Sequence, residues 1–160
     1  MSVRCDLFIA GCGPAACAAA FFAARSGLEV VQAGNNAAMA FASGLLDILG
    51  NDPQSGRPVE DPWRAIPALR EHCPQHPYAL MDGGRARLAA EEILAWLAKQ
   101  GLAYRHAGDS NSAVLTPLGS LKRTWAAPDT FWPGVQALKE RPPALLVDFA
   151  GLREYSARQI

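Results

Sequence analysis

The chain has 160 residues, which suits about one domain and excludes a large multidomain assembly within this sequence. Hydrophobic residues make up 50% of it, enough to form a core and too many for a wholly disordered chain. Fifteen lysines and arginines balance fifteen aspartates and glutamates, so there is no basic footprint for nucleic acid. Residues 1–50 hold only five of these charges, which indicates burial or close contact for the first third of the chain.

The cysteines and the uncharged stretch near the start both favour a cytoplasmic protein. The four cysteines form no Cys-x-x-Cys pair, a pattern typical of reduced thiols rather than a disulfide framework or a zinc site. Residues 7–24 carry no charge, but Gly11, Gly13 and Pro14 interrupt the apolar run. This interruption disfavours a secretory signal and a membrane span.

The first third of the chain predicts a β-α-β unit. Residues 3–10 end in four apolar residues, as a strand buried in a parallel sheet does. An alanine-rich helix is expected over 14–26, with Gly27 just past its end. A second short strand over 28–32 then lies parallel to the first, because such crossovers are right-handed and short. The fold class is therefore α/β, with a parallel sheet that is begun here and left incomplete.

The remaining chain predicts helices separated by polar loops. Asp61 and Pro62 start a short helix through His72, and a second, amphipathic helix follows Asp82 and ends at Gly101.

Short strand pieces are expected over 102–105 and 113–115, followed by a loop-rich stretch over 116–133. The apolar run over 144–149 predicts a strand that returns to the core. Residues 35–133, which lie between the β-α-β unit and this last strand, are interpreted as an inserted helix and loop region.

The segment Gly11-Cys12-Gly13-Pro14-Ala15-Ala16 carries the sharpest chemical signal. It follows a predicted strand and opens a predicted helix, which is the context that a dinucleotide-binding loop requires. Gly11 permits a sharp turn, Gly13 lets a pyrophosphate approach the backbone, and Ala16 is small enough for the helix to pack on the strand. The helix start, at Pro14 and Ala15, offers backbone N–H groups to phosphate. The alternative is a glycine turn kept only for packing.

One position departs from the usual pattern. The second strand of such a unit normally ends in an acidic residue that binds the ribose hydroxyls, whereas here Gln32 stands near that end. Gln32 is a weaker acceptor than a carboxylate. Either the ligand lacks that ribose or the adenosine site is weakened.

Other candidates for chemistry are few. The three histidines have no metal-ligand spacing, so no metal site is predicted. Lys122 and Arg123 follow a Gly-Ser turn and are either phosphate contacts or a solvated pair. Trp125 and Trp132 either line a flavin pocket or pack in the core or an interface.

Several segments, in this order, resemble one known family. They are Gly11-x-Gly13-x-x-Ala16, Ser43-Gly44-Leu45-Leu46-Asp47-Ile48-Leu49, His76-Pro77-Tyr78, Thr116-Pro117-Leu118-Gly119-Ser120-Leu121-Lys122-Arg123-Thr124-Trp125, and Trp132-Pro133. Together they resemble the B subunit of the bacterial anaerobic glycerol-3-phosphate dehydrogenase. The glycine motif is shared with many flavoproteins, whereas the second and fourth segments are much more specific.

The resemblance implies a flavin subunit of a redox complex, with FMN as its cofactor, while the glycine motif alone indicates FAD. Such a protein pairs with the catalytic A subunit, which carries FAD, and with the iron–sulfur C subunit, which docks the pair on the inner membrane. The complex oxidises glycerol 3-phosphate to dihydroxyacetone phosphate and passes electrons to quinone in anaerobic respiration. The resemblance adds Ser43, Gly44, Thr116 and Arg123 as cofactor-site candidates, and it assigns no catalytic residue.

Members of that family are much longer, so the resemblance implies that residues 1–160 are the N-terminal part of a flavin-binding domain with a Rossmann-like FAD- or NAD(P)-binding fold. This chain is therefore expected to be inactive alone. Two other interpretations stay open. One is an NAD(P)- or FAD-dependent oxidoreductase of another family, for which the acidic ribose reader near Gln32 is missing. The other is a truncated, non-catalytic interaction subunit.

Overall fold

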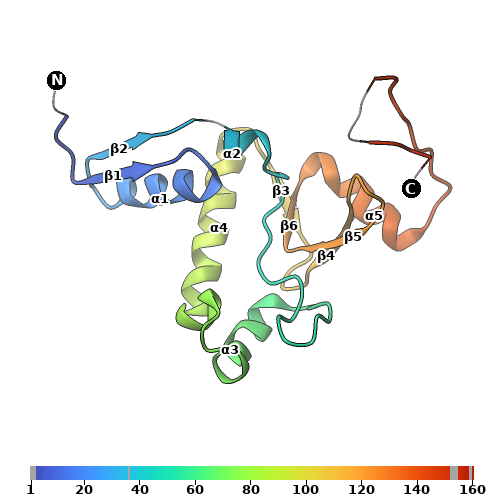
Figure 1. Ribbon diagram of the computed structural model, residues 1–160, viewed down its shortest axis with the longest axis horizontal. Coiled ribbons are helices and arrows are strands. Elements are labelled where there is room, and N and C mark those ends of the chain that lie inside the picture. The colour runs from blue at the N-terminus through green and yellow to red at the C-terminus, as the bar shows by residue number, and fades with distance from the viewer. Residues whose placement is uncertain (1–2, 36, 152–154, 159) are drawn as a thin grey trace. The chain divides into compact units, whose positions relative to one another are not determined.

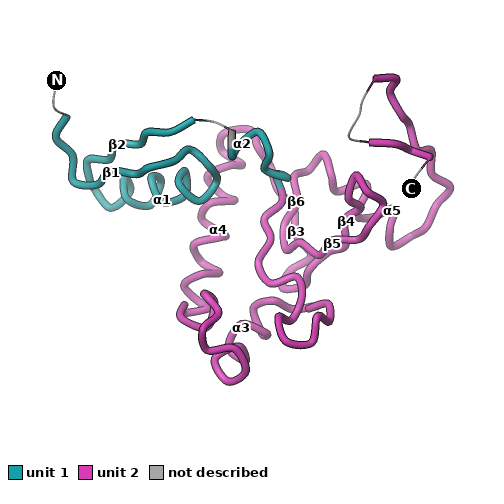
Figure 2. Tube along the Cα trace, viewed as in Figure 1, with its two compact units in different colours: residues 1–44 teal, residues 45–160 magenta. Residues whose placement is uncertain are grey.

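The structure is a computed structural model that describes residues 3–35, 37–151, 155–158 and 160. The chain divides into two compact units, residues 1–44 and residues 45–160 (Figure 2). Unit 1 and unit 2 are described separately below.

Unit 1 is the predicted β-α-β unit (Figure 1). Strand β1 (Leu7–Ala10) and strand β2 (Val30–Ala33) pair in parallel, with Leu7 opposite Val30 and Ala10 opposite Ala33. Helix α1 (Pro14–Arg25) connects them, and the four-residue helix α2 (Ala37–Ala40) follows. The parallel pair confirms the predicted α/β fold class, with a sheet that is incomplete in the described chain.

Helix α1 begins at the predicted residue and ends one residue before the predicted end. Pro14 occupies the first turn, where its missing N–H costs nothing because that group has no intrahelical partner. After Arg25 the chain reaches Gly27, whose φ of 81° is a left-handed conformation that glycine adopts without strain.

Unit 2 contains the other two predicted helices. Helix α3 (Pro62–His72) is capped by Asp61, whose carboxylate accepts a hydrogen bond from the Arg64 N–H at 3.0 Å. Helix α4 (Gly83–Lys99) is capped in the same way by Asp82, which accepts from the Arg85 N–H at 3.0 Å. A 3₁₀ turn, η1 (Pro77–Leu80), lies between these helices in the chain.

Four short strands of unit 2 form two antiparallel pairs. Strand β3 (Tyr104–His106) pairs with β6 (Ala126–Pro128), and β4 (Ser112–Leu115) pairs with β5 (Leu121–Thr124). A 3₁₀ turn, η2 (Asp129–Phe131), and helix α5 (Trp132–Glu140) complete the regular elements of the described chain. The stretch over 116–133, predicted as loop-rich, therefore holds two strands.

The core of unit 2 forms around Trp125. The side chains of Trp125 and Ala126 are fully buried at 0% exposure and pack with Leu94 of α4. A second cluster includes Ile66 and Leu69 of α3, each 2% exposed. Trp63 packs against both clusters, so α3 contributes to each of them.

The predicted core strand over 144–149 differs from the structure. Residues 141–149 have no regular secondary structure, and the side chains of Leu145 and Phe149 are 87% and 67% exposed. An apolar run becomes a buried strand only where neighbouring strands pair with it, and within the described residues β1 and β2 pair only with each other. No helix in the described part of the chain is long and apolar enough to cross a membrane.

Candidate functional site

The glycine loop of unit 1 connects β1 to α1 by a sharp turn. Gly11 has a φ of 122°, a conformation that other residues rarely adopt, and its N–H donates to the Ala33 carbonyl at 2.7 Å. Gly13 is the N-cap of α1, and no side chain caps this helix start. The first turn also contains no acidic residue. Its N–H groups and the positive end of the helix dipole therefore suit an anion such as a phosphate.

Close backbone packing holds this loop against the end of β2. A Cβ atom at Gly34 would lie 2.8 Å from the Cα of Gly11 and 3.1 Å from the N of Cys12. At Gly13, a Cβ atom would lie 3.2 Å from the Cβ of Ala38. Gly34 therefore leaves no room for a side chain, a requirement that the sequence motif did not include.

Gln32 fixes the loop from the second strand. Its Nε2 donates a hydrogen bond to the Gly11 carbonyl at 2.8 Å and lies 3.8 Å from the Cys17 Sγ. A carboxylate at this position has no proton to donate, so it cannot make the bond to Gly11. Gln32 thus has a structural contact that sequence reasoning did not predict, while its Oε1 stays an acceptor suited to a hydroxyl.

The other predicted cofactor residues fall into three places. Pro14, Ala15 and Ala16 form the start of α1 beside the glycine loop. Ser43 and Gly44 follow α2 at the end of unit 1, and Gly44 has a φ of 72°.

Thr116 and Arg123 belong to the β4–β5 hairpin of unit 2. The Thr116 Oγ1 lies 2.8 Å from the Ser120 Oγ, and the Thr116 N–H donates to the Ser120 carbonyl at 2.8 Å. Thr116 therefore shapes the turn of the hairpin. The assignment of these residues to one cofactor site stays a prediction.

Arg123 lines a polar groove of unit 2, which we call the Asn111 groove. Its volume is about 520 Å³. Its walls come from the segment before α3, the β3–β4 turn, β5 and α5: Pro58, Glu60, Ala107, Ser110, Asn111, Arg123 and Lys139. No sequence pattern indicated this groove apart from the predicted phosphate contact of Arg123.

Asn111 connects the chain segments beside the groove through three hydrogen bonds. Its side-chain Nδ2 donates to the Leu49 carbonyl at 2.8 Å and to the Val59 carbonyl at 2.9 Å. Its backbone N–H donates to the Glu60 carbonyl at 2.6 Å. Asn111 is only 6% exposed, so these bonds are shielded from competing water and fix three chain segments.

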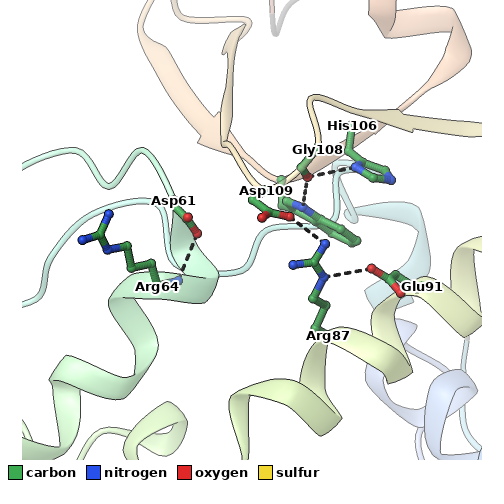
Figure 3. Close-up of polar contacts among 8 residues, drawn as sticks. Asp61, Arg64, Arg87, Glu91, His106, Gly108 and Asp109 are labelled. Carbon is green, nitrogen blue, oxygen red and sulfur yellow. Dashed lines mark hydrogen bonds and ion pairs between the residues drawn. The ribbon is translucent and has the colours of Figure 1, made fainter.

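A network of polar and aromatic contacts surrounds Trp125, and Figure 3 shows its members His106, Gly108 and Asp109. The Trp125 Nε1–H donates to the Gly108 carbonyl at 3.0 Å, and the His106 ring stacks on Trp125 with centroids 4.7 Å apart. Trp125 also meets Trp63 edge to face at 5.0 Å. These contacts assign Trp125 to the core, one of the two predicted alternatives.

Arg87 of α4 joins this network through its guanidinium. It forms ion pairs with Glu91 at 2.9 Å and with Asp109 at 2.6 Å (Figure 3). The hydrogen bonds that Arg87 donates to Glu91 and to Asp109, in that order of size, raise the pKa of Arg87 above its ordinary value. The pair with Asp109 connects α4 to the β3–β4 turn. Among the described residues, no group of three or more histidine, cysteine or acidic side chains is arranged to hold a metal ion.

Comparisons with known proteins identify one family and several relatives for this chain. The family described as FAD binding domain matches residues 6–160. Relatives named as the B subunit of anaerobic glycerol-3-phosphate dehydrogenase occur in Actinobacillus succinogenes, at 39% identity over 59% of this chain and 22% of the relative, and in Vibrio vulnificus, at 35% over 75% and 28%. The relative of that name in Yersinia pseudotuberculosis is 37% identical over 77% of this chain and 29% of its own length. No solved structure matches the chain.

These matches confirm the resemblance predicted from the sequence motifs. The aligned part of the chain spans less than a third of the length of each of these relatives.

Proposed function

Because the chain belongs to the family of FAD-binding domains, we propose that its glycine loop holds the pyrophosphate of FAD in the complete protein. The observation that supports this function is the uncapped start of α1 directly after Gly11 and Gly13. A pyrophosphate needs several N–H donors and a close approach to the backbone, and this loop offers both.

We propose FAD rather than FMN for two reasons. The family match names FAD, and FMN, which the resemblance suggested, has a single phosphate and no pyrophosphate to fill such a loop. The missing carboxylate near the end of β2 does not exclude adenosine, because the Gln32 Oε1 is a neutral acceptor for a ribose hydroxyl. Gln32 then serves two partners, Gly11 through its nitrogen and the ribose through its oxygen.

We propose that the complete protein is a flavin-binding subunit of an anaerobic glycerol-3-phosphate dehydrogenase, in line with the names of its relatives. In the complex, the secondary alcohol of glycerol 3-phosphate would become the ketone of dihydroxyacetone phosphate together with the catalytic A subunit, and the flavin of this subunit would carry electrons. The electrons would pass to quinone through the partner A and C subunits, with the complex held peripherally at the inner membrane. The residues of this chain supply binding and orientation.

The visible spectrum of the purified full-length protein tests this function. Oxidised-flavin bands, with FAD as the nucleotide released on denaturation, are the expected result. An Ala16→Arg variant should lose the flavin, because the Ala16 Cβ lies 3.8 Å from the position of a Gly11 Cβ and a long side chain there would push α1 off the loop. Ala19→Arg, at an exposed position of α1, is the matched control and should retain it. A colourless wild-type protein that does not bind added FAD or FMN would contradict the proposal.

A further inference from the structure

The outer face of the β4–β5 hairpin has the chemistry of a protein-docking surface. We propose that it binds a partner chain whose contact surface presents a carboxylate flanked by apolar side chains. Apolar residues of the hairpin contact the flanking side chains, and two cations beside them pair with the carboxylate. The inference rests on the proposed function in one respect, namely that a subunit of a complex has partner chains to bind.

The strand register divides the hairpin into two faces. In an antiparallel pair, directly opposite side chains lie on the same face, and successive side chains of one strand alternate between the faces. One face therefore carries Ser112 opposite Thr124 and Val114 opposite Lys122. Ser112, Val114 and Thr124 are each 4% exposed or less, so this inner face packs into unit 2.

The outer face is apolar and open to solvent. It carries Leu115 opposite Leu121 and Ala113 opposite Arg123, on the strand pair drawn in Figure 1. Leu115 is 39% exposed and Leu121 is 64% exposed, while Leu118 in the hairpin turn is 82% exposed. Single exposed leucines are common on protein surfaces, whereas neighbouring ones that form a patch mark an interaction site. Leu115 and Leu121 are direct cross-strand neighbours, so they form such a patch.

A residue far along the chain extends the apolar surface at the hairpin turn. A Cβ atom at Gly119 would lie 3.4 Å from both the Cα and the Cγ1 of Ile160, which places Ile160 beside the turn. Ile160 is itself 38% exposed. The apolar surface therefore includes more than the two strands.

Two cations beside this surface indicate the charge of the partner. Arg123 belongs to the outer face, and it lines the Asn111 groove together with Lys139 of α5. Within residues 3–35, 37–151, 155–158 and 160, neither side chain forms an ion pair. Glu60 lines the same groove, so two cations face one carboxylate and the groove is positively charged. A carboxylate of a partner chain is the complementary group.

The lysine next to Arg123 shows the contrast between the two faces. Lys122 belongs to the inner face, and its Nζ is paired with the Asp47 carboxylate at 2.6 Å. The cation of the inner face is thus neutralised within unit 2. The cation of the outer face has no such partner in the described chain.

The combination of leucines and cations favours a protein over a small anion. A small anion needs only the cations and leaves the leucines in water. A protein interface combines an apolar centre with a polar and charged rim. Leu121 and Arg123 are two residues apart on the same face of β5, so one partner surface contacts both.

The test is a calorimetric titration of the purified full-length protein with the purified A subunit and, separately, with the purified C subunit. We expect one of them to bind, and Leu121→Ser should raise its dissociation constant at least about tenfold, because the variant removes an apolar side chain from the contact. Leu102→Ser is the matched control, since Leu102 is 59% exposed outside the hairpin, and it should leave the affinity unchanged. A wild-type protein that binds neither subunit overturns the inference, as does an unchanged affinity of Leu121→Ser.

The double variant Arg123→Gln/Lys139→Gln tests the charge of the partner. Salt screens the attraction between exposed charges, so added sodium chloride should weaken the binding of the wild type. The double variant should bind more weakly at low salt and lose less affinity as salt is added. Lys99→Gln is the control, since Lys99 stands in the last turn of α4 as Lys139 does in α5. An equal salt dependence of the wild type and the double variant overturns the assignment of a carboxylate to the partner.

Two other occupants of the outer face give different results. If a second copy covers it, the full-length protein alone sediments as a dimer that Leu121→Ser dissociates. If a later part of the same polypeptide covers it, Leu121→Ser lowers the melting temperature of the full-length protein alone. Either result overturns the docking of a partner chain. We expect the wild type and Leu121→Ser to sediment and melt alike, because Leu121 is exposed.

Flavin absorbance keeps this inference apart from the proposed function. If Leu121→Ser keeps both the flavin and the wild-type affinity for the partner subunits, the docking inference fails and the flavin function stands. If the wild-type protein is colourless but Leu121→Ser shows the expected loss of affinity, the flavin function fails and the docking surface stands.

Discussion

Unit 1 and unit 2 bury their apolar residues to very different degrees. Unit 1 contains few charges, yet neither β1, α1 nor β2 has a buried residue, and Phe8 of β1 is 58% exposed. Unit 2 carries most of the charges, yet Trp125 and Ala126 are fully buried. The number of charged residues in a unit therefore does not determine how many of its apolar side chains are buried.

The difference follows from the number of layers that each unit stacks. Unit 1 has one helix on a two-stranded parallel pair, and parallel sheets are stable when both faces are covered. In unit 2, helices α3 and α4 and the antiparallel strands supply residues to common clusters. The charged residues there lie mainly outside these clusters. Unit 2 should accordingly depend on its core, and unit 1 on the backbone packing of the glycine loop.

The largest effect should come from the centre of unit 2. Trp125→Ala should reduce the free energy of unfolding by about 3–5 kcal/mol, because it removes a fully buried aromatic side chain and leaves a cavity. The variant also loses the hydrogen bond from the Trp125 Nε1–H to the Gly108 carbonyl. Urea unfolding followed by far-UV circular dichroism measures the change. Leu118→Ala, at a position 82% exposed, is the control and should change it by less than about 0.5 kcal/mol. Equal effects of the two variants would contradict the assigned core.

In unit 1 the corresponding test is a glycine. Gly34→Ala places a methyl group 2.8 Å from the Gly11 Cα, so the loop must shift; overpacking of this kind costs about 1–3 kcal/mol. The variant should also lose bound flavin, which absorbance of the purified full-length protein measures. Gly134→Ala in α5 meets nothing within 4 Å and should keep both stability and flavin. Retention of flavin by Gly34→Ala would show that the glycine loop does not need this close approach.

Sequence patterns predicted the elements whose signals are local. The strand, glycine turn and helix of unit 1 follow from residues adjacent in the chain, and the caps Asp61 and Asp82 mark the starts of α3 and α4 as expected. Strand β5 was missed because two of its four residues are Lys122 and Arg123, which give no apolar alternation. Its pairing is fixed instead by the Thr116–Ser120 turn.

In the candidate site, too, the sequence predicted only the features whose residues are adjacent in the chain. The motif predicted the glycine loop, but not the bond from Gln32 to the Gly11 carbonyl, since a glutamine at a strand end has many potential partners. The Asn111 groove draws its lining from four separate parts of unit 2, so no local spacing could indicate it. The apolar run over 144–149 produced the opposite error, because a strand pattern carries no information on whether neighbouring strands are present to pair with it.

The smallest expected effect is the pH dependence of stability that arises at the first turns of the helices. Helix α4 begins at a titratable cap, whereas α1 begins at Gly13 with no side-chain cap. The hydrogen bond from the Arg85 N–H is the main cause that holds the pKa of Asp82 below its ordinary value of 3.8. A carboxylate whose pKa is lower in the folded state stabilises that state above pH 3.8, and this stabilisation is lost as the pH falls through the folded-state pKa.

Asp82→Asn keeps a capping side chain without a titratable group, and it isolates this contribution. The stability difference between wild type and Asp82→Asn, from urea unfolding at several pH values, should stay constant well above pH 3.8 and shift against the wild type only below it. Since α1 has no acidic residue in its first turn, the glycine loop of unit 1 should contribute no such acid dependence. A difference that changes between about pH 5 and 7, above the range in which an aspartate with a lowered pKa titrates, would contradict the assignment of the shift to this cap.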